Sequence, residues 1–307
     1  MKVVLIGLPY FASKIADNIS RIDSKNRYVA IDTSANAWQK IRFLWHMIFA
    51  KVIYRIGGST QRGETLGLAM LFKKKIVMHW VGTDVLVAHK DYKAGMIDAD
   101  LIRRTKHLCE VNWIQTELLD MGIHAEIAQI ACFPDEIPVP PPLPKRFSIL
   151  SYVVKGREKF YGIDKLIYLA QLFPDVPIRI AGIAEYTTPL PSNVQFLGWV
   201  KDMAKEYSDC VLFLRLSEHD GLAFSVLEAL SFGRYVGYKY SFRGTNKTSD
   251  MNELRDLVDY LTERHRKGLL EFNNDGYEFI SECYSVGTVM RSLTEIVTRH
   301  VYYSADI

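Results

Sequence analysis

Two acidic residues, Asp220 and Glu228, stand eight residues apart and are the side chains that most directly suggest chemistry. Between them, Gly221 ends the apolar run 211–216, and 224–232 has helical periodicity, so a strand, an acidic loop and a helix follow one another. Free backbone N–H groups at a helix N-terminus bind anions. A carboxylate one or two turns further along accepts hydrogen bonds from sugar hydroxyls. This order of elements suits a ligand that carries both phosphate and sugar.

The segment 220–236, which reads DGLAFSVLEALSFGRYV, resembles the E-x7-E signature of retaining glycosyltransferases of family 4. Proteins of that family have the GT-B fold. Two positions depart from the signature, because the first acid is Asp220 instead of Glu and Tyr235 stands where proline is usual. The alternative interpretation is an ordinary strand–loop–helix whose acids favour the helix dipole.

The resemblance implies a role for several residues of this segment. It implies that Glu228 accepts hydrogen bonds from the nucleotide ribose and that Asp220 lies near the donor sugar as a catalytic residue. The backbone of 222–224 would line the donor site, which adds three donor-binding residues: Leu222, Ala223 and Phe224.

Three further segments match the same family in the expected order. They are GIDKLI at 162–167, PIRIAG at 177–182 and NVQFLGWV at 193–200. The last contains Gly198, which the resemblance places among the donor-binding residues. The second half of the chain therefore resembles the family's nucleotide-sugar domain over nearly its whole length.

A basic loop precedes Gly162. It contains Lys155, Arg157 and Lys159, and the position where the family carries a lysine is occupied by Tyr161. A nucleotide diphosphate carries about two negative charges and is bound by fixed cations. Either Arg157 or Lys159 replaces the missing lysine from a different register, or phosphate binding is weakened. A solvated basic loop is the alternative interpretation.

The first half offers a second group of candidate residues. A predicted strand delivers His79 and then a Gly-Thr-Asp loop that ends at Asp84, and this resembles an expanded form of the family's H-G-x-D. Ligands bind outside the carboxyl ends of strands in open α/β sheets, so we expect His79 or Asp84 to touch the donor sugar or the acceptor. A satisfied core histidine is the alternative. Gly7 opens the loop 7–11, which resembles the family's cleft-lining loop, and the resemblance places Gly7 among the donor-binding residues. This loop lacks G-x-G-x-x-G, which disfavours a nicotinamide enzyme.

These residues need a scaffold, and the pattern of strands and helices predicts an α/β protein with two Rossmann-like halves. The resemblance to GT-B proteins implies that these two domains face a cleft. In the first half we expect strands at 3–6, 28–31, 52–56, 76–81 and 110–115, and helices at 12–22, 37–50, 64–72 and 99–107. In the second half we expect strands at 147–153, 177–182, 194–197, 211–216 and 235–238, and helices at 163–172, 201–207, 225–232, from 253 and from 285.

The expected division of the chain is an acceptor-side domain at 1–136, a linker at 137–146, a donor-binding domain at 147–284 and a C-terminal helix and tail at 285–307. The linker overlaps the stretch 134–144, which contains six prolines. Such a run is stiff and extended and does not enter a sheet. By the GT-B resemblance, the final helix, 286–300, returns to the first domain.

Composition narrows the class of protein. A chain of 307 residues suits two domains, and 49% hydrophobic with 24% charged residues is typical of a soluble globular protein. The net charge of +3 does not suggest nucleic acid. Four scattered cysteines without C-x-x-C spacing predict reduced, mostly buried thiols in a cytosolic protein. The N-terminus does not read as a signal peptide, and no apolar run reaches the roughly 18 residues of a spanning helix.

The segment 38–54, WQKIRFLWHMIFAKVIY, combines Trp, Ile and Phe at helical spacing with interspersed Lys and Arg. A basic helix that carries Trp and Phe can lie on an anionic bilayer, so a peripheral membrane contact through 37–54 is one interpretation. We favour the other, a helix that flanks the sheet and is apolar on its inner face.

The sequence therefore predicts a glycosyltransferase of the hexosyltransferase type (EC 2.4) that uses a nucleotide-diphosphate sugar. The acceptor is a saccharide or a lipid-linked saccharide, as in polysaccharide, lipopolysaccharide or glycolipid synthesis. The resemblance implies retention of anomeric configuration, no cofactor and no metal, because cations and a helix terminus steady the leaving diphosphate. The expected location is cytoplasmic, including the inner membrane face. A catalytically silent GT-B partner protein and a nucleotide-sugar epimerase are the alternatives.

Overall fold

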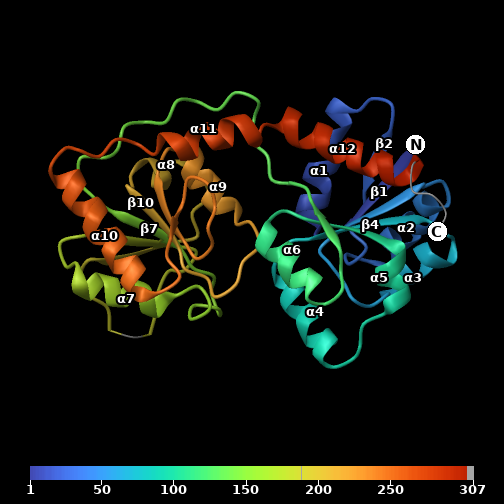
Figure 1. Cartoon of the computed structure of the whole chain (residues 1–307), viewed down its shortest axis with the longest axis horizontal. Helices are drawn as coiled ribbons and strands as arrows, with labels where there is room; N and C mark the ends of the chain where they lie inside the picture. Colours follow the sequence, from blue (N-terminus) through green and yellow to red (C-terminus); the bar gives the residue numbers. More distant parts are fainter. Residues whose placement is uncertain (188, 303–307) are drawn as a thin grey trace. The chain divides into compact units, whose positions relative to one another are not determined.

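The computed structural model describes residues 1–187 and 189–302 of the chain (Figure 1). It divides into two compact units. Unit 1 comprises Met1–Asp135 and the C-terminal segment from Tyr284, and unit 2 comprises Glu136–Cys283.

Within the described residues, unit 1 contains a six-stranded parallel sheet with the strand order β2-β1-β3-β4-β5-β6. Its strands are β1 (Lys2–Gly7), β2 (Arg27–Ala30), β3 (Val52–Ile56), β4 (Lys75–Trp80), β5 (Thr105–Cys109) and β6 (Ala125–Ile127). The helices are α1 (Pro9–Ile22), α2 (Ala37–Ile48), α3 (Gly63–Leu71), α4 (Thr83–Lys93), α5 (Ala99–Arg104), α6 (Asn112–Leu119) and α12 (Val286–Tyr302). The inner strands read as continuous apolar runs because helices cover both faces of the sheet.

The C-terminal helix α12 belongs to unit 1, as the expected return of the final helix requires. Figure 1 shows this red helix beside the blue α1. Its Met290 and Leu293 are fully buried in the core that also contains Ile15 and Ile19 of α1. At the entry to α12, Val286 N–H donates to the carbonyl of Phe133, and Ser285 forms an isolated β-bridge with the same residue. Unit 1 is therefore completed by a segment that follows all of unit 2 in the sequence.

Unit 2 repeats the architecture, and its described chain forms a six-stranded parallel sheet with the order β12-β11-β10-β7-β8-β9. The strands are β7 (Ile149–Tyr152), β8 (Ile178–Ala181), β9 (Val194–Gly198), β10 (Leu212–Arg215), β11 (Tyr235–Tyr238) and β12 (Asn246–Lys247). The helices are α7 (Ile163–Leu172), α8 (Ala204–Ser208), α9 (Phe224–Ser231), α10 (Met251–Arg266) and α11 (Asn274–Cys283). The predicted fold class is confirmed.

The sequence-based assignment was wrong for the segment 105–115 of unit 1. Residues 105–107 were expected to end a helix and 110–115 to form a strand, whereas β5 spans Thr105–Cys109 and α6 begins at Asn112. Short apolar runs do not distinguish a strand from a buried helix. Here Ile114 and Leu118, four residues apart, are the buried face of a helix.

The proline-rich segment is an extended chain that side chains of unit 2 hold in place. Arg234 donates to the carbonyls of Pro141 (2.7 Å) and Pro142 (3.4 Å). His265 Nε2 lies 2.8 Å from the carbonyl of Pro144. Because a proline-rich segment does not join a sheet, its carbonyls lack backbone partners and are satisfied by side chains instead.

Two further observations concern the cysteines and the length of the helices. The four cysteines are free, and three of them are buried. No helix in the described part of the chain is both long enough and apolar enough to cross a membrane.

Candidate functional site

The carboxyl edge of the unit 2 sheet carries the candidate donor site. From β7 the chain moves to β8 on one side, and it later returns to place β10 on the other side of β7. The connections that follow β7 and β10 therefore leave in opposite directions, and ligands bind at such a switch point in open α/β sheets. The loop after β7 contains Arg157 and Lys159, and the loop after β10 contains Asp220. The topology brings these predicted residues to one place.

An ion pair organises the loop after β10. Arg215, the last residue of β10, donates from Nε to Asp220 Oδ2 at 2.6 Å, and both side chains are largely buried. Ser217 Oγ donates to the same oxygen at 2.9 Å, and the Asp220 N–H donates to Tyr240 Oη at 3.2 Å. Burial lowers the pKa of Arg215, but the charge and hydrogen bond of Asp220, together with Tyr161 and Tyr238, raise it above its ordinary value, so the guanidinium stays charged.

Tyr161 connects this ion pair to the loop after β7. The Arg215 guanidinium lies 4.8 Å from the centroid of the Tyr161 ring, within cation–π range. The next residue, Gly162, has φ +77° at the start of α7, and a Cβ there would lie 2.7 Å from Leu216 Cβ. The Glu218 N–H donates to the carbonyl of Phe160 at 2.9 Å. The two loops thus hold each other in one conformation.

Cations from three neighbouring strand ends surround these loops. Arg157 and Lys159 after β7 are exposed, and the Arg157 guanidinium lies 4.1 Å from the Phe160 ring centroid. Lys239, directly after β11, donates from Nζ to the carbonyl of Glu218. With Arg215 from β10, these residues create a positive edge that suits an anionic ligand.

Helix α9 provides the remaining donor-side candidates. It begins at Phe224 with Ala223 as N-cap, and no side chain in the described chain caps it. Leu222 and Ala223 are buried at its entry. Glu228, on the second turn, is half-buried and accepts a hydrogen bond from Tyr207 Oη at 3.0 Å. Burial raises the pKa of Tyr207 and the Glu228 carboxylate raises it further, so the hydroxyl remains a donor to Glu228.

Gly198 lies apart from this cluster. It ends β9, the edge strand two places from β7, and its carbonyl accepts from Gly182 N–H at 2.8 Å. A Cβ on Gly182 would overlap the carbonyl of Val153, at the end of β7. Gly198 therefore contacts Gly182, which packs against the end of β7. The structure does not bring Gly198 itself to the loops after β7 and β10.

In unit 1 the corresponding switch point lies between β1 and β3, where Gly7 ends β1. Gly7 has φ +102°, and a Cβ would overlap the carbonyl of Ile56, so this position requires glycine for a structural reason. Leu8 N–H donates to the Ile56 carbonyl at 3.0 Å. The backbone of the loop after β1 is thereby packed closely on β3.

Asp84 holds the loops after β3 and β4 together. Its carboxylate accepts from the N–H groups of Gly82 (2.8 Å) and of Val81 and Val85 (3.1 Å each), and also from Gly58 N–H. A carboxylate with several backbone donors is a loop organiser. The structure thus gives Asp84 a positioning role, and its expected contact with sugar or acceptor stays a prediction.

His79 does not fit the expected role. It lies inside β4 with no exposed surface, and its Nδ1 is 2.8 Å from Tyr54 Oη. Burial lowers the pKa of His79 to about 3, so the ring is neutral at physiological pH. A substrate does not reach this side chain in the described conformation. The alternative of a core histidine describes it better, because a strand in the middle of a sheet points its side chains into the core. Its Nδ1 is hydrogen-bonded, whereas its buried Nε2 has no hydrogen-bond partner among the described residues.

Sequence reasoning missed Arg215, Tyr207 and Tyr240. One signal was present, since Arg215 is a charged residue inside the apolar run 211–216, and a charge in a buried strand needs a partner. The two tyrosines gave no signal, because their hydroxyls meet Glu228 and the Asp220 backbone only after the chain has folded.

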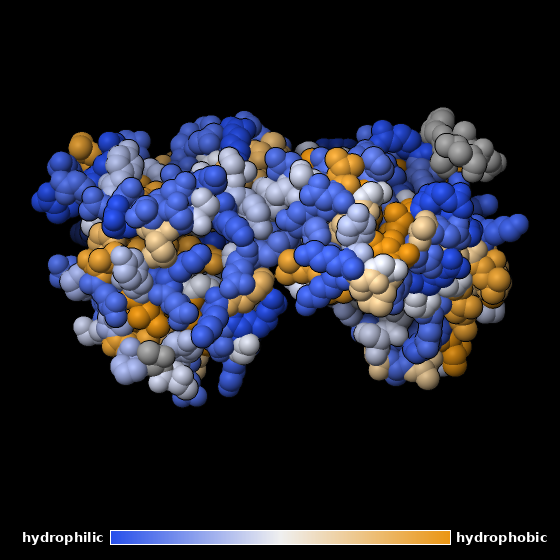
Figure 2. Space-filling view, turned by 60° about the horizontal axis from the view of Figure 1, so that its bottom comes forward, coloured by the Kyte–Doolittle hydropathy of each residue, from blue (hydrophilic) through white to orange (hydrophobic). Residues whose placement is uncertain are grey.

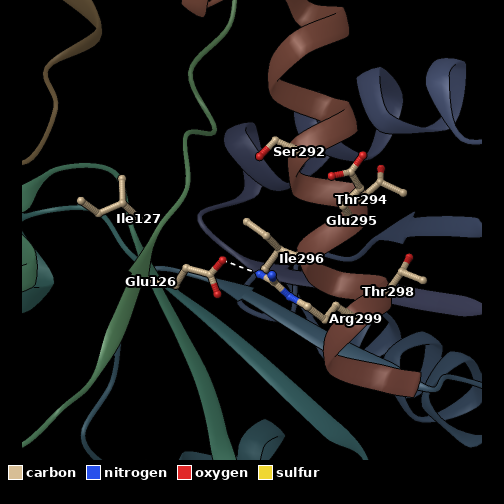
Figure 3. A pocket seen from close by; sticks show the side chains of 8 residues that line it. All are labelled: Glu126, Ile127, Ser292, Thr294, Glu295, Ile296, Thr298 and Arg299. Carbon is tan, nitrogen blue, oxygen red and sulfur yellow. Dashed lines mark hydrogen bonds and ion pairs between the residues drawn. The ribbon is translucent and has the colours of Figure 1, made fainter. Parts of the chain in front are cut away.

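A separate cavity of about 630 Å³ opens in unit 1 between β6 and α12 (Figure 3). In Figure 3 the Glu126 carboxylate from β6 faces the Arg299 guanidinium from α12, and the two groups pair at 2.5 Å. Lys106 pairs with the same carboxylate at 2.7 Å. None of the predicted site residues lines this cavity. Its ion pairs are internally satisfied, so we assign no function to it.

Comparison with known proteins identifies the fold. The chain matches HepE from Anabaena, solved in complex with UDP and glucose, with a TM-score of 0.69 at 15% identity over 97% of this chain and 99% of that chain. Sucrose-phosphate synthase from Thermosynechococcus elongatus matches with a TM-score of 0.73 at 9% identity, over 97% and 98%. A glycosyltransferase from Rickettsia africae matches with a TM-score of 0.68 at 10% identity, over 99% of both chains.

An epimerase shares the fold more distantly. UDP-GlcNAc 2-epimerase from Neisseria meningitidis, solved with UDP-GlcNAc, matches with a TM-score of 0.54 at 14% identity, over 97% of this chain and all of that chain. No protein-family profile and no curated protein sequence matches this chain. At these identities the likeness establishes the fold alone: the chain has the two-sheet α/β fold of the GT-B glycosyltransferases.

Proposed function

We propose that this protein is a glycosyltransferase that moves a sugar from a nucleotide-diphosphate sugar to a saccharide or lipid-linked acceptor. The observation that carries the proposal is the junction of the β7 and β10 loops. There the topology joins Asp220, a fixed guanidinium and the start of α9 at the switch point of a parallel sheet. The solved structures with the same fold include one bound to UDP and glucose, which supports this reading of the site.

The donor diphosphate lies, in this proposal, against the positive edge made by Arg157, Lys159 and Arg215. Glu228 accepts from the ribose hydroxyls, and the Tyr207 hydroxyl fixes its orientation. The N-terminus of α9 faces the sugar or the phosphate. These groups steady the negative charge that develops on the leaving diphosphate, so we propose that no metal ion is required.

We further propose that transfer retains the anomeric configuration. The bond from the anomeric carbon to the diphosphate oxygen breaks, and the acceptor oxygen bonds to the same face of that carbon. The proton of the acceptor hydroxyl passes to a phosphate oxygen of the leaving group. This step needs no protein base, which agrees with the buried position of His79.

Nucleotide binding tests the donor site directly. We expect one of UDP, GDP, ADP or CMP to stabilise the protein, by roughly 2.7 kcal/mol at about 100 times its dissociation constant. The Glu228→Ala variant should lose this stabilisation. Absence of any response in the wild type would contradict the proposal and favour a silent GT-B partner protein.

Turnover separates an enzyme from a silent binder. The wild type should release the nucleoside diphosphate and transfer labelled sugar in the presence of acceptor extracts. The metal-free mechanism predicts that a chelator leaves the rate unchanged. Complete loss of transfer in chelator would refute that part of the proposal while leaving donor binding intact.

The second candidate, an epimerase, is favoured by one observation, the shared fold with UDP-GlcNAc 2-epimerase. An epimerase inverts a sugar centre and therefore needs acid and base groups beside the sugar. Its product is an isomeric sugar without any acceptor. Formation of such an isomer from the nucleotide sugar alone would select this candidate over transfer.

A further inference from the structure

Helix α2 of unit 1 is apolar on two opposite faces. Phe43 and Met47, four residues apart, are fully buried against the sheet. On the other side, Trp38 and Trp45 are 70% and 64% exposed, and Ile41 between them is also exposed. The expectation that the apolar residues of this segment form the inner face is therefore wrong for most of them. Soluble monomers rarely leave such an apolar face open to water without a function for it.

The end of α3 extends this face. Lys74 Nζ donates to the carbonyl of Ile48 at 2.9 Å, and Lys40 pairs with Glu64 of α3 at 2.8 Å, so α2 and α3 lie side by side. Leu71 and Phe72, where α3 ends, are exposed, Leu71 to 74%. Figure 2 shows hydrophobic residues gathered along the right-hand margin, on the side where Figure 1 places α2 and α3.

The surroundings of the face are strongly positive. Between residues 33 and 83 the chain contains a single acidic residue, Glu64, and it is already paired. The same stretch contains eight basic residues, but Arg55 is partly buried and Arg62 pairs with Asp98 and Asp100. The other six are Lys40, Arg42, Lys51, Lys73, Lys74 and Lys75. Lys2 adds a further cation, with Nζ 5.6 Å from the centroid of the exposed Phe49 ring.

We propose that the outward side of α2, together with Phe49 and the segment 71–74, is one face that binds the surface of an anionic lipid bilayer. Trp and Phe side chains enter the boundary between headgroups and acyl chains, and Lys and Arg pair with the headgroups around them. A second copy of this chain is the less suitable occupant, because a symmetric contact would bring two sets of cations together. This surface is distinct from the residues proposed to bind the donor.

Vesicle binding tests the proposal, with the full chain and no sugar donor present, so its result is independent of catalysis. Binding to phosphatidylcholine vesicles that contain about one third phosphatidylglycerol should exceed binding to pure phosphatidylcholine, and high salt should weaken it. The double variant Trp38→Ala, Trp45→Ala should bind at least about ten-fold more weakly. The matched control is Trp199→Ala, since Trp199 of unit 2 is 80% exposed, and it should bind like the wild type.

Two charge variants test the same face in case the tryptophan double variant does not fold. Arg42→Gln and Lys73→Gln remove exposed cations, and each should weaken binding to the anionic vesicles about five-fold. Failure to bind any vesicle would overturn the proposal, as would binding that ignores both lipid charge and the two tryptophans. A dimer in light scattering that depends on Trp38 and Trp45 would overturn it in favour of self-association.

Discussion

Tyr161 stacks on the guanidinium of Arg215, with 4.8 Å between the guanidinium carbon and the ring centroid. In the family that the sequence resembles, the position of Tyr161 carries a lysine. Here the Tyr161 ring instead contacts the guanidinium of Arg215, the last residue of the neighbouring strand β10. Asp220 fixes the other side of the same guanidinium. Under the proposed function, this guanidinium from β10 takes the place of the lysine as a cation for the diphosphate.

The first prediction concerns this ion pair. Arg215→Met should destabilise the protein by about 3 kcal/mol, because it leaves the largely buried Asp220 carboxylate without its cation. Adding Asp220→Asn should recover most of that loss, since the remaining amide needs no counter-charge. Chemical denaturation of the two single variants and the double variant measures the coupling. Strictly additive effects would show that the pair does not act as a unit.

Nucleotide binding by these variants gives the second prediction. If Arg215 supplies the charge for the diphosphate, the Arg215→Met, Asp220→Asn double variant should lose most of the thermal stabilisation by the preferred nucleotide. Nucleoside binding without phosphates should change little. Equal loss of nucleoside and nucleotide binding would contradict a specific role toward phosphate.

The third prediction concerns the glycine that lets the two loops meet. Gly162→Ala should destabilise the protein by about 2 kcal/mol or more, because φ +77° is strained for alanine and its Cβ would lie 2.7 Å from Leu216 Cβ. Gly156→Ala is the matched control, since Gly156 has φ +79° but no atom within 4 Å of the added Cβ. The free energy of unfolding of Gly156→Ala should fall by only about 1 kcal/mol, which is the cost of the backbone strain. Similar melting temperatures for the two variants would argue against close packing of the loops.

The sequence predicted the two-domain fold well because buried parallel strands leave a strong signal. Apolar runs such as 52–56 and 235–238 coincide with β3 and β11. The helices α4 and α11 were missed for local reasons. In α4 only Val85 and Ala88 are buried, so its apolar periodicity is weak. In α11, Gly276 lowers helix propensity, yet it permits a close approach to Leu230 of α9 that a side chain would block.

The candidate site was predicted less completely, for a physical reason. Motif spacing located Asp220 and Glu228, because both lie within one strand–loop–helix unit. Partners such as Tyr207 and Tyr240 come from other elements, and only the folded sheet brings them close. His79 was overvalued, since sequence proximity to a Gly-Thr-Asp loop does not reveal that its ring points into the core.

The fourth prediction concerns pH and the buried carboxyl of Glu110. Burial raises its pKa to about 7, although hydrogen bonds from the N–H groups of Ile130 and Ala131 act in the opposite direction. The folded protein therefore holds a proton between about pH 4.5 and 7 that the unfolded chain has released. The stability that the neutral acid contributes is complete below this range and is lost as the pH rises through it.

Glu110→Gln keeps a neutral side chain at every pH and so removes this loss. Relative to the wild type, the variant should become more stable as the pH rises from 4.5 to 8, by about 3 kcal/mol in total. Unfolding in urea at several pH values measures the free energy of unfolding of both proteins. An effect of the amide that is the same at every pH does not alter how their difference changes with pH. The buried His79 and His107, whose pKa values are lowered to about 3 and about 4, act in the opposite direction below about pH 6.5 in both proteins. A stability difference that stays flat with pH would mean that Glu110 is ionised in the folded protein throughout this range.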